Sequence, residues 1–324
     1  MHTHSNTKFG FSQKLALILV VLLLLLTVGC TNKSNIETVT NDYAEIPLER
    51  NEIALHLDRM CLAERMHEKN ILFVHGLTYS SHEFDIDYDD YSLVRYFVRK
   101  GYTVWRVDIA GYGNSGEVKD GFMPNSDYAA LDVLKAVEKI RETTGKKKID
   151  ILGWSWGTVI SSRFAYSHPE YINKLVLYAP IFTGLGYSKI TEPFHQNDWE
   201  HAADDFQKKP NGTFDFDITE KEIIEMYCSS CWHYDGTQSP NGGRKDLCID
   251  ESKILIKPEK IKVPTFVICG DSDPYMNMSA VNGCIDNLPH GSALEIIKGA
   301  SHVMMYEKPY YHIFREKVIS FLEK

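Results

Sequence analysis

The stretch Ile149-Asp150-Ile151-Leu152-Gly153-Trp154-Ser155-Trp156-Gly157 decides the fold of this chain. Its first four residues predict a buried strand, and Trp156 to Ser167 predict a helix, so Ser155 lies on a sharp strand-to-helix turn. Any residue larger than glycine at 153 or 157 would block the close approach of strand and helix at such a turn. The pattern therefore favours Ser155 as a nucleophile. The alternative is a buried serine in an ordinary strand-to-helix connection.

Strands and helices alternate on both sides of this turn. Valine and isoleucine fill the strands almost continuously, which is typical of a parallel sheet buried on both faces, so the predicted fold class is α/β. Residues 46–61 alternate instead, as an antiparallel edge pair does. The predicted strands are Asn70–His75, Thr103–Ile109, Lys148–Gly153, Lys174–Ala179, Val263–Gly270 and Ala293–Ile297; the predicted helices are Ser126–Thr144, Trp156–Ser167, about Met278–Asn287 and Tyr310–Glu323.

The alternation breaks over residues 182–257. This segment is rich in aromatic residues and includes a turn-rich stretch, Asp235 to Gly243. We interpret it as a mainly helical cap with a loop, inserted into a core that comprises residues 46–181 and 258–324.

Three further motifs stand directly after predicted strands. The carboxyl ends of parallel strands lie at one edge of a sheet, so these motifs are expected at the same edge as Ser155. They are His75-Gly76-Leu77-Thr78, Gly270-Asp271-Ser272-Asp273-Pro274 and Gly299-Ala300-Ser301-His302.

Together with Ser155, these motifs resemble the α/β-hydrolase superfamily, and within it the capped serine hydrolases such as esterases, lysophospholipase-like lipases and serine aminopeptidases. The resemblance covers about residues 46–324. It implies that Asp273, three residues after Gly270, is the acid of a catalytic triad, with Asp271 as the competing choice. It implies that His302 is the base, because this histidine follows the last predicted strand.

The resemblance also implies an oxyanion hole formed by the backbone N–H groups of Leu77 and Trp156. Two fixed donors suit this role because a tetrahedral intermediate carries its negative charge on one oxygen. His75 is expected to order its loop by hydrogen bonding and to transfer no proton.

The implied activity is hydrolysis of carboxylic esters, including lipid or lysophospholipid esters, through an acyl-enzyme on Ser155. The aromatic cap motivates the apolar acyl group. Serine aminopeptidase, thioesterase and acyltransferase activities use the same triad and stay open, and a non-catalytic binding protein of this fold is the remote alternative. Epoxide hydrolases and haloalkane dehalogenases carry an aspartate at this turn, so neither activity is expected. No cofactor or metal is implied.

Two other stretches have a structural and a functional interpretation. The acidic residues between Glu83 and Asp90 are interpreted as a solvated loop before a helix from about Tyr91, although alternating acids also suit Ca²⁺. Asp108 to Gly116 is interpreted as a structural glycine-rich loop, because it lacks the Gly-Lys-Ser/Thr ending of a phosphate loop.

The first thirty residues have the layout of a signal peptide. Lys8 and Lys14 precede an apolar run from Leu15 to Leu26, which is shorter than the roughly 20 residues of a membrane-spanning helix. The following Thr27-Val28-Gly29-Cys30 resembles a bacterial lipobox. This implies a signal peptide over 1–29, a lipidated Cys30 with a tether over 30–45, and an exported lipoprotein anchored to a membrane of the cell envelope. A secretory signal that happens to contain a cysteine, or an uncleaved signal anchor, are the alternatives.

Charge and cysteine usage add two expectations. The formal net charge is −9 and no stripe of lysine and arginine is present, so nucleic acid is not an expected partner. Seven cysteines are present, and export permits disulfides, so a bridge from Cys248 to Cys228 or Cys231 is plausible. Neither a redox Cys-x-x-Cys motif nor a zinc site has the required context.

Overall fold

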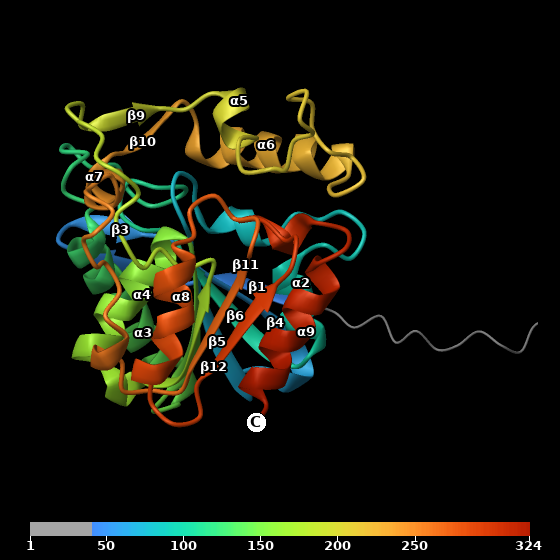
Figure 1. Ribbon diagram of the computed structural model, residues 1–324. Helices are drawn as coiled ribbons and strands as arrows, with labels where there is room; N and C mark the ends of the chain where they lie inside the picture. Colours follow the sequence, from blue (N-terminus) through green and yellow to red (C-terminus); the bar gives the residue numbers. More distant parts are fainter. Residues whose placement is uncertain (1–40) are drawn as a thin grey trace, which may run out of the picture. The chain divides into compact units, whose positions relative to one another are not determined.

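The computed structural model describes residues 41–324, whose helices and loops are arranged around a central sheet (Figure 1). The predicted signal peptide, Cys30 and the tether up to residue 40 lie outside the described residues. The sheet has eight strands in the order β1-β4-β6-β5-β7-β8-β11-β12; β1, β4 and β6 are antiparallel neighbours and all later neighbours are parallel. The strands are β1 (Asn41–Glu45), β4 (Leu57–Leu62), β5 (Lys69–Val74), β6 (Tyr102–Val107), β7 (Ile149–Trp154), β8 (Ile172–Tyr178), β11 (Thr265–Gly270) and β12 (Ala293–Ile297).

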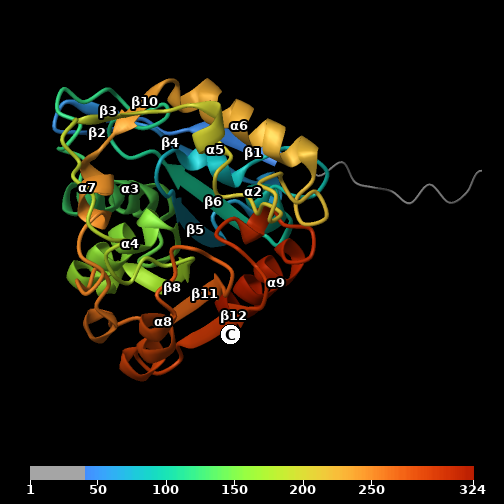
Figure 2. The ribbon, with the colours of Figure 1, turned by 45° about the horizontal axis from the view of Figure 1, so that its top comes forward.

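Helices cover both faces of this sheet (Figures 1 and 2). Their apolar residues pack into two separate buried clusters, one with α2 and α9 on one face and one with α3, α4 and α8 on the other. All residues of β6, β7 and β11 are buried, which explains their continuous valine and isoleucine. The helices are α2 (Leu93–Arg99), α3 (Ser126–Thr144), α4 (Trp156–Ser167), α8 (Met278–Cys284) and α9 (Tyr311–Leu322).

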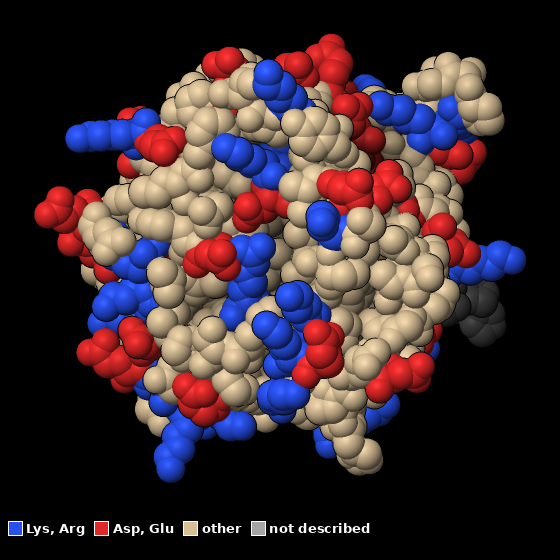
Figure 3. Space-filling model, turned by 60° about the vertical axis from the view of Figure 1, so that its left-hand side comes forward, with Lys and Arg blue, Asp and Glu red and all other residues tan. Residues whose placement is uncertain are grey.

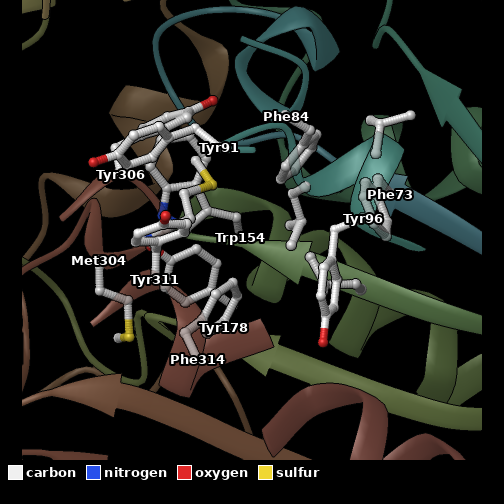
Figure 4. Close-up of a cluster of buried hydrophobic side chains, with 14 of the residues drawn as sticks. Phe73, Phe84, Tyr91, Tyr96, Trp154, Tyr178, Met304, Tyr306, Tyr311 and Phe314 are labelled. Carbon is white, nitrogen blue, oxygen red and sulfur yellow. The ribbon is translucent and has the colours of Figure 1, made fainter. Parts of the chain in front are cut away.

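Large aromatic side chains fill the cluster under α2 and α9 (Figure 4). Phe73 meets Phe97 edge to face with ring centroids 5.3 Å apart, and Tyr178 packs on Phe314 at 4.4 Å. Trp154, the last residue of β7, stacks on Tyr178 at 5.9 Å. Such close-packed rings have few alternative rotamers, so they fix the end of β7, where Ser155 follows.

The observed elements confirm the predicted α/β fold. Helices α3 and α4 have the predicted bounds, and the predicted strands match within a few residues. One boundary was wrong: residues 41–45, assigned to the tether, form β1 and pair with β4 along their full length. The pairing satisfies the backbone groups that face β4, which a polar sequence can do at the edge of a sheet without burying much apolar surface. The residues after β1 form a hairpin of β2 (Leu48–Arg50) and β3 (Ile53–Leu55).

The inserted segment lies over the same end of the sheet as the motif loops, at the top of Figure 1. It contains helices, as predicted, but the expectation of a mainly helical cap was wrong: helices cover 25 of its 76 residues, and the rest is loop and a two-stranded ribbon. Its elements are β9 (Phe194–Gln196), α5 (Trp199–Ala202), α6 (Lys221–Asp235), β10 (Gln238–Pro240) and α7 (Gly242–Leu247).

The expected disulfide between Cys248 and Cys228 or Cys231 is absent from the described residues, where every cysteine is a free thiol. Cys228 and Cys231 lie on the buried face of α6, whereas Cys248 follows α7. The two helices present these thiols to different surroundings, so nearness in the sequence did not produce a bond.

Charged side chains of both signs are mixed on the face shown in Figure 3. Within residues 41–324, no helix combines the length and apolarity that crossing a bilayer requires.

Candidate active site

Ser155 lies between β7 and α4, as predicted, with a strained backbone. Its φ of 55° and ψ of −120° are in a region that residues other than glycine rarely adopt. Its N–H donates to the carbonyl of Tyr178 at 3.1 Å, which ties the turn to the neighbouring strand β8. The side chain stands at the N-terminus of α4, where the helix dipole favours negative charge.

The glycines around Ser155 are required by the close packing of backbone. A Cβ on Gly153 would overlap the carbonyl oxygen of Gly157, and a Cβ on Gly157 would overlap that of Val74 at the end of β5. A Cβ on Gly76 would lie 2.9 Å from Cβ of Ser155. The loop after β5 therefore lies directly against the serine, which only a residue without a side chain allows.

Asp273 and His302 form a buried pair at the ends of β11 and β12. The Oδ2 atom of Asp273 lies 2.7 Å from Nδ1 of His302, and the side chains are 0% and 2% exposed. The two loops are held together because the N–H of Ser272 donates to the carbonyl of Ala300 at 3.0 Å. The competing acid, Asp271, is exposed and instead accepts the N–H of Gly299 at 2.6 Å.

Hydrogen bonds to its backbone carbonyl also fix the position of His302. Its carbonyl oxygen accepts hydrogen bonds from Nε1 of Trp154 at 3.1 Å and from the hydroxyl of Tyr178 at 2.9 Å. Burial opposes the protonation of this imidazole, but the neighbouring charge and hydrogen bond of Asp273 raise the pKa of His302 above its ordinary value. The Asp273 contact therefore favours the protonated imidazolium, which a base forms when it takes a proton.

Leu77 and Trp156, whose N–H groups are the predicted oxyanion-hole donors, both lie next to Ser155. Leu77 lies on the loop packed against Ser155, and Trp156 is the first residue of α4. Neither N–H donates to an acceptor within residues 41–324. Trp156 is one of the first helical residues, whose N–H groups lack a partner inside the helix.

Ser155, His302 and Leu77 line one cavity of about 300 Å³. Its apolar wall includes Leu77, Ile181, Leu185 and Leu247. The polar side chains around it, besides Ser155 and His302, are Thr78, Tyr79, His201, Asp204, Asp205, Arg244, Cys248 and Tyr275. The structure thus brings Ser155, His302 with Asp273 behind it, and the loop after β5 together at the carboxyl end of the sheet.

A family model described as "Serine aminopeptidase, S33" matches residues 65–309, which is most of this chain. The chain belongs to the S33 serine aminopeptidase family. It is therefore an α/β hydrolase of the esterase and aminopeptidase type.

The chain is similar to several known proteins at low sequence identity. An uncharacterized carboxylesterase from Bacillus subtilis is 24% identical, with 78% of each chain covered. A proline iminopeptidase from Saccharolobus solfataricus is 25% identical, over 76% of this chain and 84% of its own. The structure of potato epoxide hydrolase I is similar with a TM-score of 0.60 and 17% identity, over 87% of this chain and 99% of its own. This structural likeness supports the fold alone.

Two loop interpretations agree with the structure. Nδ1 of His75 lies 2.8 Å from the carbonyl of Gly76, and its Nε2 accepts the N–H of Ile109, so the ring joins two loops. Asp108 is fully buried and accepts the N–H groups of Ser81 and Asn114, so the glycine-rich loop is held by protein contacts.

The interpretation of the acidic run as solvated was wrong for Glu83. This residue is 2% exposed, and its Oε1 accepts the hydroxyl of Tyr227 on α6 at 2.6 Å. The carbonyl of Glu83 accepts the hydroxyl of Tyr306. Burial raises the pKa of Glu83 well above its ordinary value. Glu83 therefore joins the inserted segment to the core.

The inserted segment contributes polar residues to the cavity that were not predicted from the sequence. Arg244 and His201 belong to α7 and α5, and Asp205 follows α5. No motif marks them, because their positions depend on how the insertion folds back over the sheet.

Proposed function

We propose that this chain is a serine esterase that hydrolyses small carboxylic esters through an acyl-enzyme on Ser155. The observation that carries the proposal is that Ser155 and the Asp273-paired His302 line the same cavity. A serine hydroxyl becomes a useful nucleophile when a paired histidine accepts its proton.

The proposed reaction has two halves, acylation of Ser155 and hydrolysis of the acyl-enzyme, and His302 acts as base and then as acid in each. Nδ1 of His302 faces Asp273, which leaves Nε2 to accept the proton of Ser155. The serine oxygen attacks the ester carbonyl, and the N–H groups of Leu77 and Trp156 stabilise the negative oxygen. His302 then protonates the leaving alcohol. A water molecule, deprotonated by His302, attacks the acyl-enzyme and releases the acid.

The size of the cavity supports small substrates. About 300 Å³ is at the lower end of the range for ligand pockets, roughly 300–1,000 Å³. Leucine and isoleucine side chains form its apolar wall, which suits a short hydrocarbon acyl group. This narrows the expected ester from long-chain lipids to short acyl chains.

A panel of p-nitrophenyl esters of increasing acyl length tests the proposal, measured beside amino-acid arylamides. We expect the highest kcat/KM among the short esters, little turnover of arylamides, and loss of all turnover in Ser155→Ala. A protein that cleaves arylamides and leaves every ester intact is not an esterase.

Aminopeptidase activity is the second candidate. It is supported by the family match and by the proline iminopeptidase relative. Asp204 and Asp205 line the cavity, and carboxylates are suitable partners for a substrate ammonium group. The arylamides in the same panel distinguish this activity from the first.

We also propose that the protein is exported and anchored by lipid on Cys30, on the strength of the signal-like sequence before it. Cys30→Ser is expected to move the protein from the membrane fraction to the soluble fraction. Unchanged partitioning into detergent argues against lipidation.

A further inference from the structure

Arg244 stands out among the polar groups of the cavity because every partner of its guanidinium is neutral. Its Nη2 donates to Oγ1 of Thr78 at 2.6 Å and lies 3.5 Å from Nε2 of His201. Its Nη1 donates to Oδ1 of Asn241 at 2.9 Å. No carboxylate within residues 41–324 forms an ion pair with Arg244.

Arg244 is half-buried, and two other arginines with little exposure, the half-buried Arg50 and the buried Arg106, each have a carboxylate partner. Arg50 lies 2.6 Å from Asp132, and Arg106 lies 2.6 Å from Asp58. A cation removed from water without a counter-ion is costly, and native proteins pair such groups. Burial lowers the pKa of Arg244, yet a guanidinium stays protonated at neutral pH. The guanidinium of Arg244 thus has no ion-pair partner among the described residues, although Asp204 and Asp205 line the same cavity.

The two carboxylates that line the cavity contact groups other than Arg244. Asp205 accepts the hydroxyl of Tyr275 at 2.9 Å, and Asp204 forms an ion pair with Lys208 at 3.0 Å. These contacts leave the guanidinium of Arg244 as a cation available to a ligand.

We propose that Arg244 binds an anionic group, a carboxylate or a phosphate, on the ester that Ser155 attacks. Arg244 contacts Thr78, which directly follows the proposed oxyanion residue Leu77, and it lines the same cavity as Ser155. The guanidinium N–H groups not used by protein partners suit the oxygens of such an anion. The inference rests on the proposed esterase function, and it narrows the substrate class to short esters with a charged end.

The test compares three p-nitrophenyl esters of similar length: the butyrate, which is neutral, the glutarate monoester, which carries a carboxylate, and the 4-phosphonobutanoate, in which a phosphonate stands for phosphate. Wild-type kcat/KM is expected to be at least about tenfold higher for one of the anionic esters than for the butyrate. Which anionic ester is preferred distinguishes carboxylate from phosphate.

Arg244→Gln removes the charge and keeps polar atoms. We expect a loss of about 10- to 100-fold on the preferred anionic ester and little change on the butyrate. Arg244→Lys is expected to retain part of the preference, since it keeps the charge but not the planar fork. Lys245→Gln, the exposed neighbour on α7, removes the same charge outside the cavity and is expected to leave the preference unchanged.

Two results overturn the inference: a wild type without preference for either anionic ester, or an equal loss on all three esters in Arg244→Gln. The second result means that Arg244 acts only by holding Thr78. Competition on the wild type gives a measurement that needs no variant, since glutarate is expected to inhibit butyrate hydrolysis more strongly than the neutral glutaramide does.

Binding to Ser155→Ala separates this inference from the proposed function. Glutarate, or 4-phosphonobutanoate if the phosphonate ester is preferred, is expected to raise the melting temperature of Ser155→Ala, and not that of Ser155→Ala with Arg244→Gln. If no ester is hydrolysed but this difference appears, the esterase proposal fails and the anion site stands. If the butyrate is hydrolysed and the difference is absent, the anion site fails and the esterase proposal stands.

Discussion

Asp273→Asn is expected to lower kcat by about four orders of magnitude, or about 5 kcal/mol of transition-state stabilisation. The estimate follows from the geometry of the pair. The two side chains are 2.7 Å apart and almost fully buried, so water does not screen their interaction. An asparagine amide that donates to Nδ1 of His302 leaves the proton on Nε2, where the imidazole can no longer accept the proton of Ser155.

The same variant is expected to shift the pH dependence of hydrolysis. His302 must be neutral to act as a base, so activity rises as pH rises through the pKa of His302. Burial opposes protonation of His302, and the charge of Asp273 raises its pKa above the ordinary value. Removing that charge lowers the pKa, so the low-pH limb of the kcat/KM profile is expected at a lower pH, with a much smaller plateau.

The assay is steady-state hydrolysis of the best p-nitrophenyl ester across a pH series, with far-ultraviolet circular dichroism to verify folding. Asp271→Asn is the matched control, because Asp271 is exposed and its Oδ1 contact with Gly299 is retained by asparagine. Its activity is expected within about twofold of wild type. A loss of less than tenfold in a folded Asp273→Asn protein, or an equal loss in Asp271→Asn, refutes this assignment.

Two further tests measure protein stability, one of the glycine packing beside Ser155 and one of the buried acid Glu83. Gly157→Ala forces a Cβ into the carbonyl oxygen of Val74 and is expected to lower the free energy of unfolding, measured in urea, by about 2–3 kcal/mol or more. Gly283→Ala is the control, because no atom lies within 4 Å of the added Cβ, and it is expected to stabilise α8 by up to about 1 kcal/mol. Equal effects of the two variants would contradict the steric explanation. The raised pKa of buried Glu83 means that its contribution to stability is present while it is protonated and is lost as pH rises through that raised pKa. The glutamine of Glu83→Gln cannot ionise, and its Oε1 still accepts the hydroxyl of Tyr227. The melting temperature of this variant is therefore expected to fall less than that of the wild type between about pH 5 and pH 9. Parallel plots of melting temperature against pH would show that Glu83 does not titrate in this range.

The central part of the fold was predictable because its signals are local. The helix from Ser126 to Thr144 begins with an Asn125 cap and ends before Gly145, and the observed bounds are the predicted ones. The strand-to-helix turn at Ser155 is also marked locally, by a glycine two residues to either side of the serine. The family resemblance implied Asp273, and His302 was the histidine that follows the last predicted strand; the structure places the two side chains 2.7 Å apart.

The remaining features depend on contacts between distant parts of the chain. Residues 41–45 are polar and become a strand only because β4 offers an edge to pair with. Glu83 lies in an acidic run, and its burial depends on Tyr227, which is 144 residues away. Arg244 reaches Thr78 across 166 residues. Composition and periodicity carry no information about such contacts, so neither the buried acid nor the cavity cation was predicted.

Labelling with a fluorophosphonate, followed by intact-mass and peptide mass spectrometry, tests the central claim most directly. An activated serine attacks the phosphorus and keeps it as a stable adduct, whereas an ordinary serine hydroxyl does not react. We predict one adduct per chain, located on Ser155, and none in Ser155→Ala. Absence of the adduct in folded wild-type protein, or an adduct that persists in Ser155→Ala, contradicts the assignment of Ser155 as the nucleophile.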